Sequence, residues 1–68
     1  MNITKSERKA LKDDGMTNAR CLEERIDRNG YVMKLISATS PYGERLYGWW
    51  VDGDSAKDIR WSREKANA

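Results

Sequence analysis

The chain has 68 residues, one cysteine and no histidine, and its 13 lysines and arginines against 11 aspartates and glutamates give a formal charge of +2. This length supports one domain with a thin core, and the composition excludes an intramolecular disulfide, a zinc site of cysteine and histidine, and an imidazole base. We therefore expect a single domain over residues 1–68 that is not an enzyme, uses no cofactor or metal, and acts by binding another molecule.

A short helix is predicted at the start of the chain. Thr4 and Glu7 have the spacing of a capping box, in which the hydroxyl accepts a hydrogen bond from the backbone three residues on and the glutamate reaches back. The helix should run to about Asp13 and stop at Gly15, because glycine readily adopts the left-handed backbone of a helix end.

A second helix is predicted from Asn18 to Arg28, ended by Asn29-Gly30. Its apolar residues share one helical face, and they are Ala19, Leu22 and Ile26. Asn-Gly is also a strong hairpin signal, so the segment Arg20–Asp27 is alternatively a strand paired with the residues after the turn. Glu24 would then interrupt an apolar strand face between Leu22 and Ile26, and this interruption favours the helix.

A β-hairpin is predicted in the middle of the chain. Residues Tyr31–Ala38 are nearly all apolar, as in a strand. Ser40–Gly43 has the composition of a turn, with a proline that presets φ and a glycine that closes it. Leu46–Val51 then reads as the returning strand.

The remaining residues complete the predicted fold. Asp52–Asp54 is a second turn signal, and the alternation over residues 59–61 suggests a short third strand. Residues 1–3 and 62–68 are expected to be flexible ends. The predicted class is α+β, with two short N-terminal helices followed by a small antiparallel β-sheet. The alternative is an all-β meander in which Arg20–Asp27 is the first strand.

The order of these elements resembles that of small winged-helix proteins, including the compact excisionase-type domains of mobile elements. The segments that carry the resemblance are Gly15–Thr17 between the helices, Leu22–Ile26, and Gly30–Val32 leading into the hairpin. The resemblance implies a nucleic-acid-binding module, a small regulator or architectural factor. Its second helix would enter the DNA major groove while the hairpin tip touches phosphate or the minor groove.

Four arginines are the candidate DNA contacts. Arg20, Arg25 and Arg28 lie on the predicted second helix, and Arg45 lies on the hairpin. Guanidinium groups suit both guanine edges and phosphates. Residues 17–30 nevertheless hold three arginines and three acids, so an ion-paired, solvated face explains them at least as well.

The aromatic residues support a second hypothesis, in which the partner is a larger protein. Tryptophan and tyrosine are favoured at protein interfaces. We expect Trp49 and Trp61 in the core, because so small a domain needs large rings inside. Trp50, on the opposite sheet face, and Tyr42, in the turn, are the candidate interface residues. Such a protein would be an inhibitor or adaptor of the kind that viruses and mobile elements encode, and a homodimer also remains open.

Two further expectations concern single strands and membranes. Aromatic rings on a sheet near Lys34, Arg45 and Arg60 can stack the bases of a single strand, although core packing already explains these rings. The chain has no segment long and apolar enough to cross a membrane, and its start lacks the apolar core of a signal peptide. We therefore expect a cytoplasmic protein without membrane contact.

Overall fold

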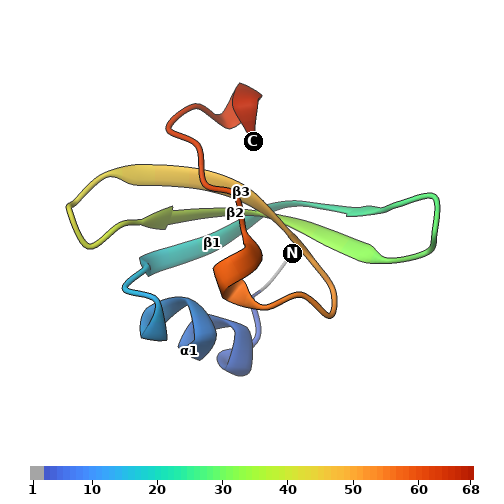
Figure 1. Cartoon of the computed structure of the whole chain (residues 1–68), viewed down its shortest axis with the longest axis horizontal. Helices are drawn as coiled ribbons and strands as arrows, with labels where there is room; N and C mark the ends of the chain where they lie inside the picture. The colour runs from blue at the N-terminus through green and yellow to red at the C-terminus, as the bar shows by residue number, and fades with distance from the viewer. Residues whose placement is uncertain (1–2) are drawn as a thin grey trace.

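The computed structural model describes residues 3–68, which form one helix, a three-stranded antiparallel sheet and two short 3₁₀ turns (Figure 1). The sheet order is β1-β2-β3, so each strand pairs with the next one in the chain. The α+β class is confirmed. Residues 1 and 2 of the expected flexible start lie outside the described residues. The elements are α1 (Lys5–Asp13), β1 (Thr17–Ile26), β2 (Val32–Thr39), β3 (Arg45–Val51), η1 (Ala56–Asp58) and η2 (Lys65–Asn67).

The helix α1 begins at the predicted capping box. Thr4 Oγ1 accepts from the Glu7 amide at 3.2 Å, and Glu7 Oε1 accepts from the Thr4 amide at 2.9 Å. These bonds satisfy N–H groups that have no partner within the helix. After α1 the chain turns at Gly15, which has a φ of 83° and lies against the ring of Pro41. The capping box therefore fixes where the helix starts, and Gly15 lets the chain turn back towards the sheet.

The predicted second helix is wrong, because residues 17–26 form the strand β1. This strand pairs with β2 from Thr17 opposite Thr39 to Ile26 opposite Val32. The register shifts between Cys21 and Glu23, which places an extra residue there and breaks the simple alternation of a strand. The alternative first strand is therefore correct in position, but the all-β class is not, since α1 precedes it.

The two hairpin turns share one arrangement. In each, the first residue, Asp27 or Ser40, uses its side-chain oxygen to accept from the backbone N–H groups two and four positions on. The residue three positions after it is a glycine, Gly30 or Gly43, with a φ of 87° or 84°. A three-residue loop that ends in a left-handed glycine is a common hairpin connection. The Asn29-Gly30 pair therefore lies in a three-residue loop and does not form a two-residue turn.

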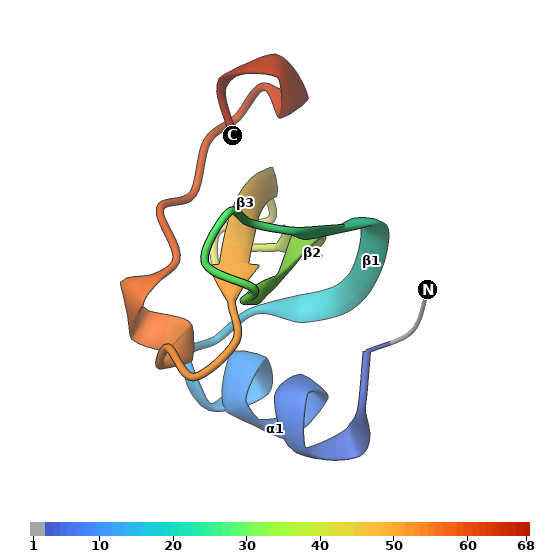
Figure 2. The same ribbon diagram turned by 90° about the vertical axis from the view of Figure 1, so that its right-hand side faces the viewer.

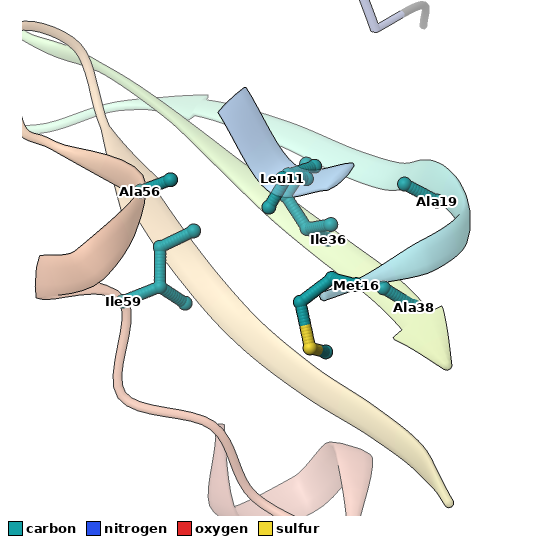
Figure 3. Close-up of a cluster of buried hydrophobic side chains, with 7 residues drawn as sticks. All are labelled: Leu11, Met16, Ala19, Ile36, Ala38, Ala56 and Ile59. Atoms are coloured by element: carbon teal, nitrogen blue, oxygen red, sulfur yellow. The ribbon is translucent and has the colours of Figure 1, made fainter. Parts of the chain in front are cut away.

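The core lies between the sheet and the elements α1 and η1, and we call this side of the sheet the covered face (Figures 1 and 2). Ile36, in the central strand, is completely buried there, and Leu11 of α1 is 1% exposed. Figure 3 shows how side chains from both ends of the chain meet around Ile36. The buried cluster consists of Leu11, Met16, Ala19, Ile36, Ala38, Ala56 and Ile59.

The C-terminal segment crosses β3 and then passes to the other side of the sheet (Figure 2). It crosses at Gly48, where an added Cβ would lie 2.5 Å from Ile59 Cγ2 and 2.9 Å from the Arg60 carbonyl oxygen. Beyond the crossing, the backbones of Tyr47 and Ser62 exchange two hydrogen bonds of 2.8 Å. The predicted third strand over residues 59–61 is thus reduced to one bridge at Ser62, and η2 follows beside β3.

Candidate nucleic-acid interface

The side of the sheet away from α1 and η1 carries aromatic and arginine side chains, and we call it the open face. Successive side chains of a strand point to opposite sides of the sheet. Along β2, every second residue from Met33 onward therefore points to the open face. The strand register places side chains of all three strands side by side. The three rows are Arg20–Ser37–Tyr47, Glu23–Leu35–Trp49 and Arg25–Met33–Val51.

Trp49 and Arg25 form the middle of the open face. The guanidinium carbon of Arg25 lies 5.1 Å from the centroid of the Trp49 ring, within the range of a cation–π contact. Arg25 Nη2 also pairs with Glu23 Oε1 at 3.1 Å. Leu35, between Glu23 and Trp49 in the same row, is only 3% exposed. The Trp49 ring is therefore partly buried, with an apolar residue as its neighbour in the register and a cation 5.1 Å from its centroid.

Arg45 and Arg20 lie at the other end of the open face. Arg45 Nη1 donates to Ser37 Oγ at 3.1 Å and to the Asn18 carbonyl oxygen at 3.3 Å. Ser37 is 4% exposed, and Arg20 is its neighbour on β1. The Arg45 guanidinium group thus contacts Ser37, and Arg20 lies beside Ser37 in the strand register. Tyr47 completes this region from β3.

Three of the four arginines predicted to contact DNA therefore share one face. Arg20, Arg25 and Arg45 lie on the open face, although the sequence assigned the first two to a helix. Arg28 lies in the exposed β1–β2 turn. Sequence reasoning did not include Tyr47 and Trp49 in this surface. Their spacing of two puts both on one side of a strand, but Trp49 was expected to face the core.

The tryptophans differ from their predicted roles. Trp50 was expected away from the core, but it packs against the covered-face cluster, and its Nε1–H donates to the Asp54 carbonyl oxygen at 2.9 Å. Trp49 was expected in the core but lies on the opposite face, outside the buried cluster, and Trp61 is partly buried against that cluster. Tyr42 is 90% exposed at its hairpin tip. An interface role for Trp50 and Tyr42 stays a prediction.

Cys21 and the acidic residues suggest no chemistry of their own. Burial raises the pKa of the Cys21 thiol, whose Sγ donates to the Glu23 carbonyl oxygen at 3.3 Å. A protonated, partly buried thiol is a poor nucleophile. Among residues 3–68 there is no group of three or more side chains placed to hold a metal ion. In the same range, no helix is long and apolar enough to cross a membrane.

Comparison with known proteins adds no relative. No family model, curated protein or solved structure matches the chain. The interpretation of the open face therefore depends on its own geometry and charge.

Proposed function

We propose that this protein binds single-stranded nucleic acid on the open face of its sheet. The observation that carries the proposal is the grouping of Trp49 and Tyr47 with three arginines on one side of the sheet. Proteins that bind single strands combine aromatic rings, on which bases stack, with cations that follow the phosphates. A four-stranded sheet with stacking aromatics does the same in a common class of RNA-binding module.

The dimensions of the open face suit a short stretch of nucleotides. Arg25 and Arg45 lie opposite Met33 and Thr39 on β2, which are six residues apart. Six residues of strand span about 20 Å. Trp49 and Tyr47 lie between these two arginines on the adjacent strand. A single strand running along the sheet would thus meet cations at both ends and aromatic rings between them.

The strand β1 changes the binding mode expected from the winged-helix resemblance. Residues 17–26 are a strand, so this segment supplies no recognition helix. The major groove admits a helix or a two-stranded ribbon. Here the sheet is three strands wide and is bordered by the C-terminal segment along β3. These features favour a single strand over a duplex as the ligand.

The test is fluorescence anisotropy with a labelled ten-nucleotide oligo(dT) and a ten-base-pair duplex at low salt. We expect the single strand to bind more tightly. Trp49→Ala should weaken its binding about tenfold or more, because stacking contributes about 1–3 kcal/mol per base. Tyr42→Ala, which removes an exposed ring at the hairpin tip, is the matched control and should bind as the parent does.

Salt dependence checks the role of the arginines. With three arginine–phosphate contacts, the log–log slope for a single strand should be about −2, and Arg20→Ala should reduce it by about 0.7. A thermal melt of each variant confirms that it is folded. Absence of binding at low salt, or full binding by a folded Trp49→Ala variant, would contradict the proposal. Tighter binding of the duplex would also contradict it, because the ligand would then be double-stranded.

A second candidate function is an adaptor or inhibitor that binds a larger protein. The observation that favours it is the exposure of large side chains at both hairpin tips, where Tyr42, Ile26 and Tyr31 are 90%, 72% and 54% exposed. Exposed aromatic and aliphatic side chains are typical anchors of protein interfaces. In such a complex Tyr42→Ala would weaken binding, whereas it leaves the oligonucleotide affinity unchanged. This single variant separates the two candidates.

A further inference from the structure

A groove on the covered side of the sheet is separate from the open face. Its volume is about 380 Å³, and it lies between the first turn of α1, the middle of the sheet and the turn after β3. Its floor is apolar and its rim is acidic. The lining residues are Glu7, Glu24, Val32, Lys34, Trp50, Val51, Asp52, Gly53 and Asp54.

The apolar floor continues to the end of the β1–β2 hairpin. Trp50 forms part of the floor and is held in place by its 2.9 Å bond to the Asp54 carbonyl oxygen. A second hollow, of about 530 Å³, is lined by Glu24, Arg25, Ile26 and Val32, so it shares Glu24 and Val32 with the first. Ile26 is 72% exposed. An apolar strip thus runs from Trp50 past Val32 to the hairpin tip.

The rim of the groove has an excess of negative charge, with four carboxylates against one ammonium group. Glu7 is engaged already, because Lys34 Nζ lies 2.9 Å and 3.2 Å from its two oxygens. Burial raises the pKa of Glu7, but its bonds from the Thr4 amide and Lys34 outweigh burial and lower it. The carboxylates of Glu24, Asp52 and Asp54 are exposed around the apolar floor.

We propose that this groove binds an extended basic segment of a partner protein, in which arginine or lysine alternates with apolar residues. In an extended segment successive side chains point to opposite sides. Apolar side chains would pack on Trp50 and Val32, and the cations would reach the carboxylates of the rim. Charge complementarity of this kind selects partners and suppresses wrong ones. The proposal is independent of nucleic-acid binding, since it concerns the other side of the sheet and a ligand of opposite charge.

The indole group of Trp50 makes a direct test possible. We would titrate the ¹⁵N-labelled protein with the peptide acetyl-Leu-Arg-Val-Arg-Leu-amide. The three tryptophan indole N–H signals of the protein would be followed by NMR. The Trp50 signal should move, because its N–H lies in the groove, while the Trp49 signal reports on the open face and should not. The same peptide with glutamate in place of arginine is the charge-reversed control and should leave all three signals in place.

A charge-neutralising pair of variants sharpens the test. Asp52→Asn with Asp54→Asn should weaken peptide binding about fivefold to tenfold, as expected for the loss of two partly exposed charge contacts. The Asp54 backbone carbonyl, which holds Trp50, is retained in this variant. Asp13→Asn, an exposed acid at the end of α1 outside the groove, is the matched control and should bind within about twofold of the parent.

Three results would overturn the proposal. They are a Trp50 signal that stays fixed at millimolar peptide, equal binding of the glutamate peptide, and equal weakening by Asp13→Asn. Movement of the Trp49 signal instead would place the peptide on the open face. Concentration-dependent movement of the Trp50 signal without peptide would identify a second copy of this chain, through its own arginines, as the occupant.

Discussion

Leu35 and Ile36 are neighbours in the central strand and are almost equally buried, at 3% and 0% exposed, yet they belong to opposite sides of the sheet. Ile36 is enclosed by other elements, because α1 and η1 pack on the covered face. Leu35 points to the open face, where its neighbours in the strand register are Glu23 and Trp49 and where the C-terminal segment lies beside β3. Similar burial is thus reached under α1 and η1 on one side, and beside cross-strand side chains and the C-terminal segment on the other.

This difference separates stability from binding. Side chains such as Arg25 and Trp49 can change rotamer without unfolding the chain, whereas α1 can leave Ile36 only if the core opens. The open face can therefore rearrange around a ligand while the covered face maintains the fold. Substitutions on both faces test this contrast, from the largest expected effect to the smallest.

Replacing Ile36 and Leu35 in turn by alanine tests the contrast most directly. Ile36→Ala should lower the free energy of unfolding by about 3–5 kcal/mol, because the elements around it cannot close the cavity. Leu35→Ala should cost only about 2 kcal/mol, since the side chains above it can collapse into the space. Urea denaturation of both variants measures the difference. A cost for Leu35→Ala equal to or above that for Ile36→Ala would contradict the distinction between the two faces.

Gly48→Ala should destabilise the protein by about 1–3 kcal/mol, because the new methyl group would overlap the crossing segment. The nearest atom is Ile59 Cγ2, at 2.5 Å from the added carbon. In a double-mutant cycle, Ile59→Ala should therefore reduce the cost of Gly48→Ala. Purely additive effects in thermal melts would mean that the clash is with the Arg60 carbonyl oxygen and the Trp61 ring, and not with Ile59. A neutral Gly48→Ala would mean that the segment does not cross there.

The Glu7–Lys34 ion pair should make a small, pH-dependent contribution. Its side chains are 27% and 19% exposed, so we expect less than about 1 kcal/mol at neutral pH. The pKa of Glu7 is lowered from 4.5, so this stability is present above pH 4.5 and is lost as the pH falls through the folded value. The hydrogen bond to Glu7 raises the pKa of Lys34 above 10.5, so the stability is also lost as the pH rises beyond that value.

The variant Glu7→Gln isolates this effect. The difference in unfolding free energy between parent and variant should be largest near neutral pH and should decrease at both extremes. Glu23→Gln, the same substitution in the 3.1 Å pair with Arg25 on the open face, is the control. Its side chains are 40% and 60% exposed, so its effect at neutral pH should be the smaller of the two. A larger effect from Glu23→Gln would contradict the comparison of the faces.

Local signals in the sequence predicted the helix and both hairpin strands, but not β1. The capping box and the turn residues act over a few positions, so their outcome can be derived from the sequence. In β1 the extra residue near Leu22 breaks the alternation, and Glu24 interrupts what would be an apolar strand face. The register places Glu24 beside Lys34, which compensates its charge. That partner lies ten residues away in the chain and is known only once the strands are paired.

The candidate site shows the same limit. Alternation correctly places Trp49 and Trp50 on opposite faces of β3. Which of the two faces receives the core depends on where α1 and η1 pack, and the sequence of β3 does not contain this information. Arg20 and Arg25 were identified through a helical interpretation and Arg45 through the hairpin, yet the three lie together because β1, β2 and β3 form one sheet. Tertiary packing, not local preference, thus decides the composition of the open face.

The irregular backbone of β1 also has a consequence for behaviour at high concentration. Strands at the edge of a sheet offer unpaired N–H and C=O groups to other chains, which is a common route to amyloid. On β1, Asn18 has a φ of 51°, and the register shifts twice between Thr17 and Glu23. Regular pairing of a second chain along residues 17–23 is disfavoured by these irregularities. We therefore expect the two register shifts of β1 to oppose fibrillar aggregation through this edge.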